Sequence, residues 1–100
     1  MSHFAVIAWD VPDSGAIRDK ARGAHFAHIE RIINKVAVAG PLKDAGGAIV
    51  GSLVVLDVVD AVEAEAVFKS DPYFAAGVWA TWTINPFVAA AGEWVGGKTW

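Results

Sequence analysis

Hydrophobic positions follow two different spacings along this chain, and the two spacings predict strands and helices in alternation. The apolar run Phe4–Trp9 ends at the turn-prone segment Asp10–Gly15, which is typical of a strand covered on both faces. From residue 16 to about residue 35, apolar residues recur every three or four positions, which predicts a helix of about five turns. Ser14 or Asp13 should cap this helix, because short oxygen-bearing side chains satisfy the free N–H groups of a helix start.

The middle of the chain predicts a hairpin. Val36–Ala39 is a second strand, which Gly40-Pro41 interrupts. Because proline cannot donate a hydrogen bond to a neighbouring strand, it suits a sheet edge or a bulge. The turn signal Asp44–Gly47 then leads into the β-branched run Ala48–Val59, so these two segments should pair.

A second helix and a last strand complete the pattern. Helical spacing covers Asp60–Ser70 until Asp71-Pro72 breaks it, since the residue before a proline is pushed out of the α region. Val78–Ile84 then alternates as a strand. The resulting order is βαββαβ, which predicts an α+β ferredoxin-like sandwich with both helices on one face of an antiparallel sheet.

The last strand also suggests what covers the other face of the sheet. Strict alternation would place Val78, Ala80, Trp82 and Ile84 on one face, and Trp79, Thr81 and Thr83 on the other. A tryptophan on each face is unusual for a sheet with one face in water. Hydrophobic residues also make up 55% of the chain, and a small domain has little interior in which to bury them. We therefore expect a homodimer in which two sheets pack face to face.

Composition and charge exclude several classes of partner. The net charge is −3 and lysine and arginine do not cluster, so nothing favours nucleic acid. The absence of cysteine excludes disulfides, thiolate metal sites and a cysteine nucleophile. No signal peptide and no run long enough to cross a membrane occur, so a cytoplasmic location is expected. We expect one domain over residues 1–92 and a C-terminal tail over residues 93–100, which either wraps a partner subunit or frays.

One face of the first helix carries the best candidates for chemistry. Arg18, Arg22 and His25 follow one another at spacings of four and three residues, which places their side chains on one helical face. Asp71, before Pro72, is the candidate carboxylate partner of His25. Such a contact would fix the imidazole tautomer and raise the basicity of the other ring nitrogen, which prepares a general acid or base. We expect a separation of about 2.6–3.2 Å, although the same spacing also fits a histidine with only a packing or surface role.

Several motifs together resemble the YCII-related (YciI-like) family. They are Arg18–His25, Ala39–Leu42, Gly51–Leu53 and Asp71–Tyr73 with Ala76-Gly77, which occur in the family's order and approximate spacing between Phe4 and about Gly92. The resemblance implies a ferredoxin-like subunit of the dimeric α+β barrel superfamily, with His25 and Asp71 as the catalytic pair. It also implies an activity such as removal of chloride from a chlorinated hydroxyhydroquinone, and related barrels include muconolactone isomerases. Phe26, His28 and the tryptophan-bearing C-terminus depart from the family pattern, so the substrate end of the pocket is expected to differ.

The working hypothesis is a lyase or isomerase-like enzyme that needs no cofactor and acts on a small anionic or phenolic molecule. In this hypothesis His25 shuttles a proton, Asp71 orients the imidazole, and Arg18 or Arg22 holds a substrate anion. The alternative is a non-catalytic small-molecule-binding or regulatory module of the same fold. An open cavity that reaches a ring nitrogen of His25 would favour the enzyme.

Two further side chains are candidates for binding substrate. His28 lies one helical turn from His25, and such a pair could bind a metal ion, but no nearby carboxylate on the helix completes a ligand set. A pocket-lining or core role is therefore preferred for His28, and no metal is expected. Tyr73 could offer its hydroxyl to a substrate, although packing beside Pro72 explains it equally well.

Overall fold

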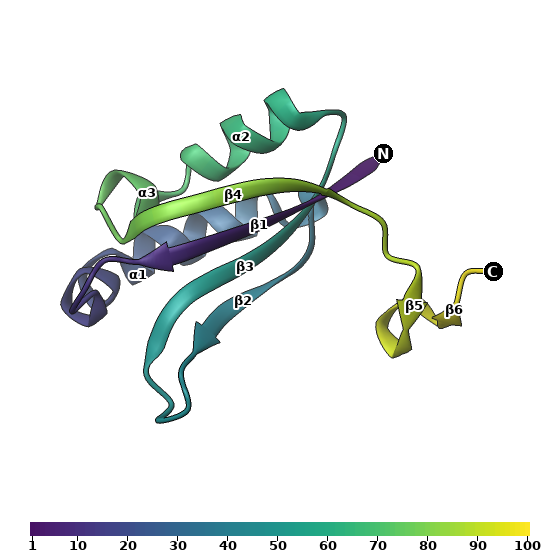
Figure 1. The fold of residues 1–100 in the computed structure, drawn as a ribbon. Coiled ribbons are helices and arrows are strands. Elements are labelled where there is room, and N and C mark those ends of the chain that lie inside the picture. Colours follow the sequence, from purple (N-terminus) through teal and green to yellow (C-terminus); the bar gives the residue numbers. More distant parts are fainter.

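The structure is a computed structural model that describes residues 1–100, in which a four-stranded antiparallel sheet carries its helices on one face (Figure 1). In chain order the main elements are β1 (Ser2–Asp10), α1 (Gly15–Arg31), the 3₁₀ turn η1 (Ile33–Lys35), β2 (Val36–Lys43), β3 (Ile49–Val58), α2 (Ala61–Lys69), α3 (Pro72–Ala75) and β4 (Trp79–Phe87). A short C-terminal hairpin follows, with β5 (Ala91–Gly92), η2 (Glu93–Val95) and β6 (Gly97–Lys98).

The strand order β2-β3-β1-β4 places β1 and β3 in the centre of the sheet. Each of the three neighbouring pairs is antiparallel. This arrangement is ferredoxin-like, as the βαββαβ pattern predicted. Pro41 lies in β2 and Pro86 in β4, and both are edge strands, where a missing N–H donor costs no ladder hydrogen bond.

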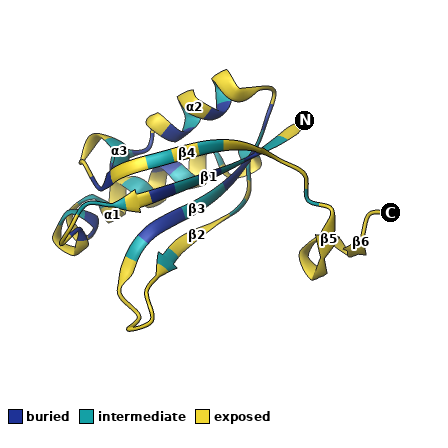
Figure 2. Cartoon of the chain, viewed as in Figure 1, coloured by how far each residue is buried: buried dark blue, intermediate teal, exposed yellow.

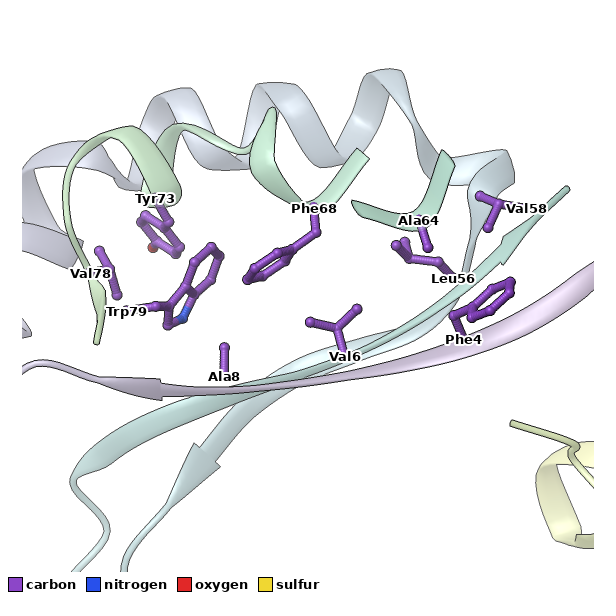
Figure 3. Close-up of a cluster of buried hydrophobic side chains, with 10 residues drawn as sticks. All are labelled: Phe4, Val6, Ala8, Leu56, Val58, Ala64, Phe68, Tyr73, Val78 and Trp79. Carbon is purple, nitrogen blue, oxygen red and sulfur yellow. The ribbon is translucent and has the colours of Figure 1, made fainter. Parts of the chain in front are cut away.

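Alternation along β1 builds the core. Phe4, Val6 and Ala8 are buried, and Figure 3 shows all three on the side of the sheet that faces the helices. Phe68 of α2 and Leu56 of β3 belong to the same hydrophobic cluster. Figure 2 shows that buried positions concentrate on the two central strands, whereas the C-terminal segment is exposed. Burial of this one apolar layer fixes α1, α2 and α3 above the sheet.

The prediction of one tryptophan on each face of the sheet is wrong, because β4 contains a bulge. Thr81 lies opposite Trp9, but the next residue of β1, Asp10, lies opposite Trp79, so Ala80 is the extra residue. The bulge turns Trp79 and Trp82 to the same face, where their ring centroids lie 4.8 and 6.0 Å from that of Phe68. Trp79 is thus buried within a single subunit, and its burial says nothing about a second sheet.

The outer face of the sheet is nevertheless rich in apolar side chains. Ile7 lies opposite Leu53 and Ala5 lies opposite Val55, on the face turned away from the helices; Val55 is buried there and the other three are half-buried. Phe87, at the end of β4, is 44% exposed. An apolar face of this kind is typical of a surface that pairs with another protein surface.

Three local expectations differ from the structure. The first α-helix ends at Arg31, and Ile33–Lys35 form a 3₁₀ turn instead of continuing it. Strand β2 continues through Gly40-Pro41 to Lys43, because an edge position tolerates the proline. Pro72 does more than end α2: it occupies the first turn of a new helix, α3, where its fixed φ and missing N–H are favourable.

Ser14 precedes α1 but does not cap it with its side chain. Its hydroxyl instead donates to Asp10 Oδ2 over 2.6 Å. Asp13, the other candidate, has a positive φ of 58° and shapes the turn into the helix. The expected cap is therefore replaced by a hydrogen bond that holds the Asp10 carboxylate.

The C-terminal hairpin lies beyond the end of β4, away from the helices (Figure 1). Its Trp94 and Trp100 are 85% and 76% exposed. None of the helices combines the length and the apolar character needed to cross a membrane.

Candidate functional site

The imidazole of His25 is held by the carboxylate of Asp71, the partner expected from its position before Pro72. His25 Nδ1 lies 2.8 Å from both carboxylate oxygens. Because a carboxylate only accepts hydrogen bonds, Nδ1 carries the proton, and Nε2 of the neutral ring is left with a free lone pair. The contact leaves His25 able to accept a proton at Nε2.

Asp71 is itself fixed by the local fold. It is the N-cap of α3, where Oδ1 accepts the backbone N–H of Tyr73 over 2.8 Å. Pro72 restrains the backbone that follows, so the carboxylate has little freedom to turn away from α1. The residue pair Asp71-Pro72, which ends one helix and begins the next, therefore positions the partner of His25.

Tyr73 supports the histidine from the side. Its ring stacks on that of His25, with centroids 3.9 Å apart and planes inclined by 9°. The guanidinium carbon of Arg18 lies 5.1 Å from the centroid of the Tyr73 ring. Stacking and the Asp71 hydrogen bond together restrict rotation of the imidazole about both of its side-chain bonds.

A cavity of about 330 Å³ opens beside this group, between α1 and strands β2 and β3. The cavity is lined by polar and charged side chains, Arg18, Arg22, His25, Ser52 and Tyr73, and by residues that are mostly apolar: Phe26, Ile29, Ala39, Gly40, Pro41, Ile49, Val54 and Trp79. Its size and its mixture of lining groups suit a small organic molecule with a few polar substituents.

Arg18, in the cavity wall, is anchored by a buried ion pair. Its Nε and Nη2 donate to the two carboxylate oxygens of Asp10 over 2.8 and 2.9 Å. The Arg18 and Asp10 side chains are only 8% and 3% exposed. Nη2 also donates to Ser52 Oγ over 2.9 Å and to the carbonyl of Gly51 over 3.2 Å. Most of the hydrogen-bonding capacity of Arg18 is thus used within the protein.

Arg22 is the more accessible of the two arginines. Its side chain is 45% exposed, and Nη2 donates to Asp19 Oδ1 over 2.6 Å. This hydrogen bond to Asp19 raises the pKa of Arg22 above its ordinary value. Arg22 therefore stays cationic at the mouth of the cavity, where an exposed ion pair exchanges its partner at little cost.

His28 lies outside this cavity. It is buried, and its Nε2 is 3.5 Å from the hydroxyl of Ser70, on the side of α1 that faces α2. No three histidine, aspartate or glutamate side chains come together as a metal site would require. The structure thus brings Arg18, Arg22, His25, Asp71 and Tyr73 to one place and leaves His28 apart from them.

A family model, the YCII-related domain, matches residues 2–88. The chain belongs to the YCII-related family. No curated protein matches it. Among solved structures, it is similar to 5-chloro-2-hydroxyhydroquinone dehydrochlorinase (TftG) from Burkholderia phenoliruptrix AC1100, in complex with 2,5-dihydroxybenzoquinone. The TM-score is 0.80 and the sequence identity 25%, over 91% of this chain and 96% of that one. The likeness supports the ferredoxin-like fold of this YCII-related chain and the family that its motifs indicated.

Two residues that matter to the site were missed from the sequence. Asp10 looked like the start of a turn, yet it neutralises Arg18. Ser52 lies within the run Ala48–Val59 that predicted a strand, yet it forms part of the cavity wall. The only signal for Ser52 was the Gly51–Leu53 motif of the YCII-related family, and no spacing along the chain connects Asp10 with Arg18.

Proposed function

We propose that this YCII-related protein is a lyase or isomerase-type enzyme in which His25 Nε2 is the proton acceptor. The observation that carries the proposal is the His25–Asp71 contact of 2.8 Å beside an open cavity. An imidazole held in one tautomer, with its second nitrogen free, is prepared for general acid–base catalysis. The reaction transfers a proton and a leaving group, and it needs neither an oxidant nor a reductant.

In the proposed reaction, Nε2 takes the proton of a ring O–H group and delivers it to the carbon that bears chlorine, so that the O–H carbon becomes a carbonyl and the chlorinated carbon becomes tetrahedral. A second ring O–H then loses its proton, and its electron pair forms another carbonyl. The ring double bond shifts toward the tetrahedral carbon and expels chloride, so that HCl is lost overall. Asp71 stabilises the imidazolium that forms, and a proton on Nε2 can return to the product or to water.

The proposed substrate is a small phenolic ring. The similar TftG structure is that of a dehydrochlorinase of 5-chloro-2-hydroxyhydroquinone, and the cavity here has apolar walls formed by Ile29, Val54 and Trp79. Such walls favour a flat ring, whereas the polar groups of the lining favour oxygen substituents. Arg22 is the group best placed to attract an ionised oxygen, since Arg18 is already paired with Asp10.

The test is chloride release from 5-chloro-2-hydroxyhydroquinone by the wild type and by Asp71→Asn and His25→Gln. Asparagine caps helices about as well as aspartate, so Asp71→Asn should preserve α3 and the melting temperature. It should nevertheless lower kcat/KM by about 10²–10⁴, the usual contribution of general acid–base catalysis. Wild-type activity in either variant would contradict the proposal and favour a binding module in which the pair only holds α3 against α1.

We also propose that two subunits pair through the outer face of the sheet. The proposal is supported by the apolar side chains on the outer face of β1 and β3, among them Ile7 and Leu53. Neither of these two residues belongs to the hydrophobic core of the subunit. Face-to-face packing of two such sheets would bury both layers. The exposed Trp94 of the C-terminal hairpin would then lie close to the subunit boundary.

A further inference from the structure

Ser52 has an unusual set of hydrogen-bond partners. It lies in β3 opposite Ala8, on the side of the sheet that faces the helices, and is only 7% exposed. Its Oγ accepts from Arg18 Nη2 over 2.9 Å and from Trp79 Nε1 over 3.3 Å. Both partners can only donate, since neither a guanidinium nor an indole N–H has a lone pair to offer.

These two contacts fix the direction of the Ser52 proton. A hydroxyl has one O–H donor and two acceptor lone pairs, and here both lone pairs face donors. The proton must therefore point away from Arg18 and Trp79. Ser52 donates to no acceptor within the protein, whereas a buried hydroxyl normally has a partner. The remaining direction is the cavity, whose wall Ser52 helps to form.

We infer that the Ser52 hydroxyl donates a hydrogen bond to an oxygen of the bound ligand, and that the cavity selects rings with a carbonyl or phenolate oxygen at this position. The inference rests on the proposed function and extends it by naming a second group that contacts the substrate. When His25 takes a proton from the ring, negative charge develops on a ring oxygen. A donor aimed at that oxygen before the reaction stabilises the charge without having to reorganise.

The surroundings strengthen Ser52 as a donor. A hydroxyl that accepts hydrogen bonds becomes a better donor itself, because the bonds polarise one another. One of its two donors is the cationic Arg18, which the buried Asp10 carboxylate holds in place. The ion pair between Arg18 and Asp10 therefore serves the site indirectly, by orienting and polarising Ser52. A nucleophilic role for Ser52 is disfavoured, because none of its contacts is a base that could take its proton.

The experiment compares binding of two probes, 2,5-dihydroxybenzoquinone and toluene, to the wild type, Ser52→Ala and Ser52→Thr. Ser52→Ala should weaken binding of the quinone about tenfold or more, the usual effect of losing a hydrogen bond to a charged or strongly polarised oxygen. The same substitution should change the affinity for toluene by no more than about twofold relative to the wild type. Ser52→Thr keeps the hydroxyl and should retain most of the quinone affinity. Ser70→Ala, which removes a hydroxyl outside the cavity, is the matched control.

A measurement on the wild type covers the case in which Ser52→Ala does not fold. If Ser52 donates to the probe, its oxygen becomes a stronger acceptor, so the indole N–H resonance of Trp79 should shift downfield with the quinone but not with toluene. The inference would be overturned by any of three results: Ser52→Ala weakens binding of both probes equally, the Trp79 resonance does not shift with the quinone, or the wild type does not bind the quinone. Binding needs no turnover, so a wild type that binds the quinone through Ser52 but releases no chloride would refute the proposed function alone.

Discussion

Arg18 and Arg22 lie one turn apart on the same helix, and the structure predicts opposite consequences for their replacement by alanine. Arg18→Ala leaves the Asp10 carboxylate, only 3% exposed, with the Ser14 hydroxyl as its remaining side-chain donor. Breaking a buried ion pair in this way costs about 3–5 kcal/mol. A small domain has roughly 5–15 kcal/mol of stability in total, so Arg18→Ala should remove a large part of it.

Arg22→Ala is the matched control, because it deletes the same side chain from the same helix. Its partner Asp19 is 69% exposed, and exposed ion pairs contribute at most about 1 kcal/mol. Chemical denaturation at a fixed protein concentration should therefore separate the two variants by about 2 kcal/mol or more. In thermal melts, Arg18→Ala should lower Tm by roughly 12 °C or more, since 1 kcal/mol corresponds to at least about 4 °C in a domain of this size.

A double variant tests the cause of the loss. Asp10→Asn combined with Arg18→Met removes both charges and keeps most of the volume, so it should be more stable than Arg18→Ala alone. If Arg18→Ala instead stayed within about 1 kcal/mol of the wild type, the ion pair would not be the anchor described here. Arg18 would then be free to bind a substrate anion, and the inference about Ser52 would lose one of its two donors.

Three further predictions concern the rest of the fold. Sedimentation velocity should show a dimer of the wild type at micromolar concentration, and Leu53→Asp on the outer sheet face should yield a folded monomer; a monomeric wild type would refute the proposed pairing. Gly51→Ala should cost about 1–3 kcal/mol, because a Cβ there would lie 2.5 Å from the carbonyl oxygen of Ala8; an unchanged denaturation midpoint would contradict this close approach. The hydrogen bond from the N–H of Val59 lowers the pKa of Glu63 from its ordinary value of 4.5. The ionised carboxylate therefore stabilises the fold above pH 4.5, and this stabilisation is lost as the pH falls through the lowered pKa of the folded state. The stability advantage of the wild type over Glu63→Gln should accordingly shrink in acid, and a difference independent of pH would show that the charge plays no part.

The order of elements could be predicted from the sequence because periodicity reports directly on burial. Alternation along β1 arises from one apolar face, which the structure buries in the core. The helix before residue 31 is buried less completely, since Arg18 and His28 are its buried residues and Ile17 and Ala21 pack against the core only in part. Strict side-chain alternation failed in β4, where the extra residue Ala80 places both tryptophans on the same face. A bulge leaves no clear mark in the sequence, because Val78–Trp82 fits the period of a regular strand as well as it fits a bulged one.

The His25–Asp71 contact could be anticipated because two local signals coincide. A helix face carries the histidine, and an X-Pro pair fixes the carboxylate at the start of α3. Both signals depend on backbone rules that act over a few residues. The topology then brings the middle of α1 and the start of α3 together on the same side of the sheet.

The role of Arg18 could not be anticipated in the same way, because helical spacing tells which side chains share a face but not what lies against that face. Arg18 and Arg22 look equivalent in the sequence, yet a turn with a positive φ at Asp13 brings the end of β1 over Arg18 only. The same turn lets Ser14 hold the Asp10 carboxylate. Arg18 thereby donates to Ser52 in the cavity wall, whereas Arg22 remains at the cavity mouth. The different roles of Arg18 and Arg22 are thus set by Asp10, at the end of a strand that lies eight residues before Arg18. Only the hydrogen-bond partners in three dimensions show that Arg18 is anchored within the protein and that Arg22 remains available to a ligand.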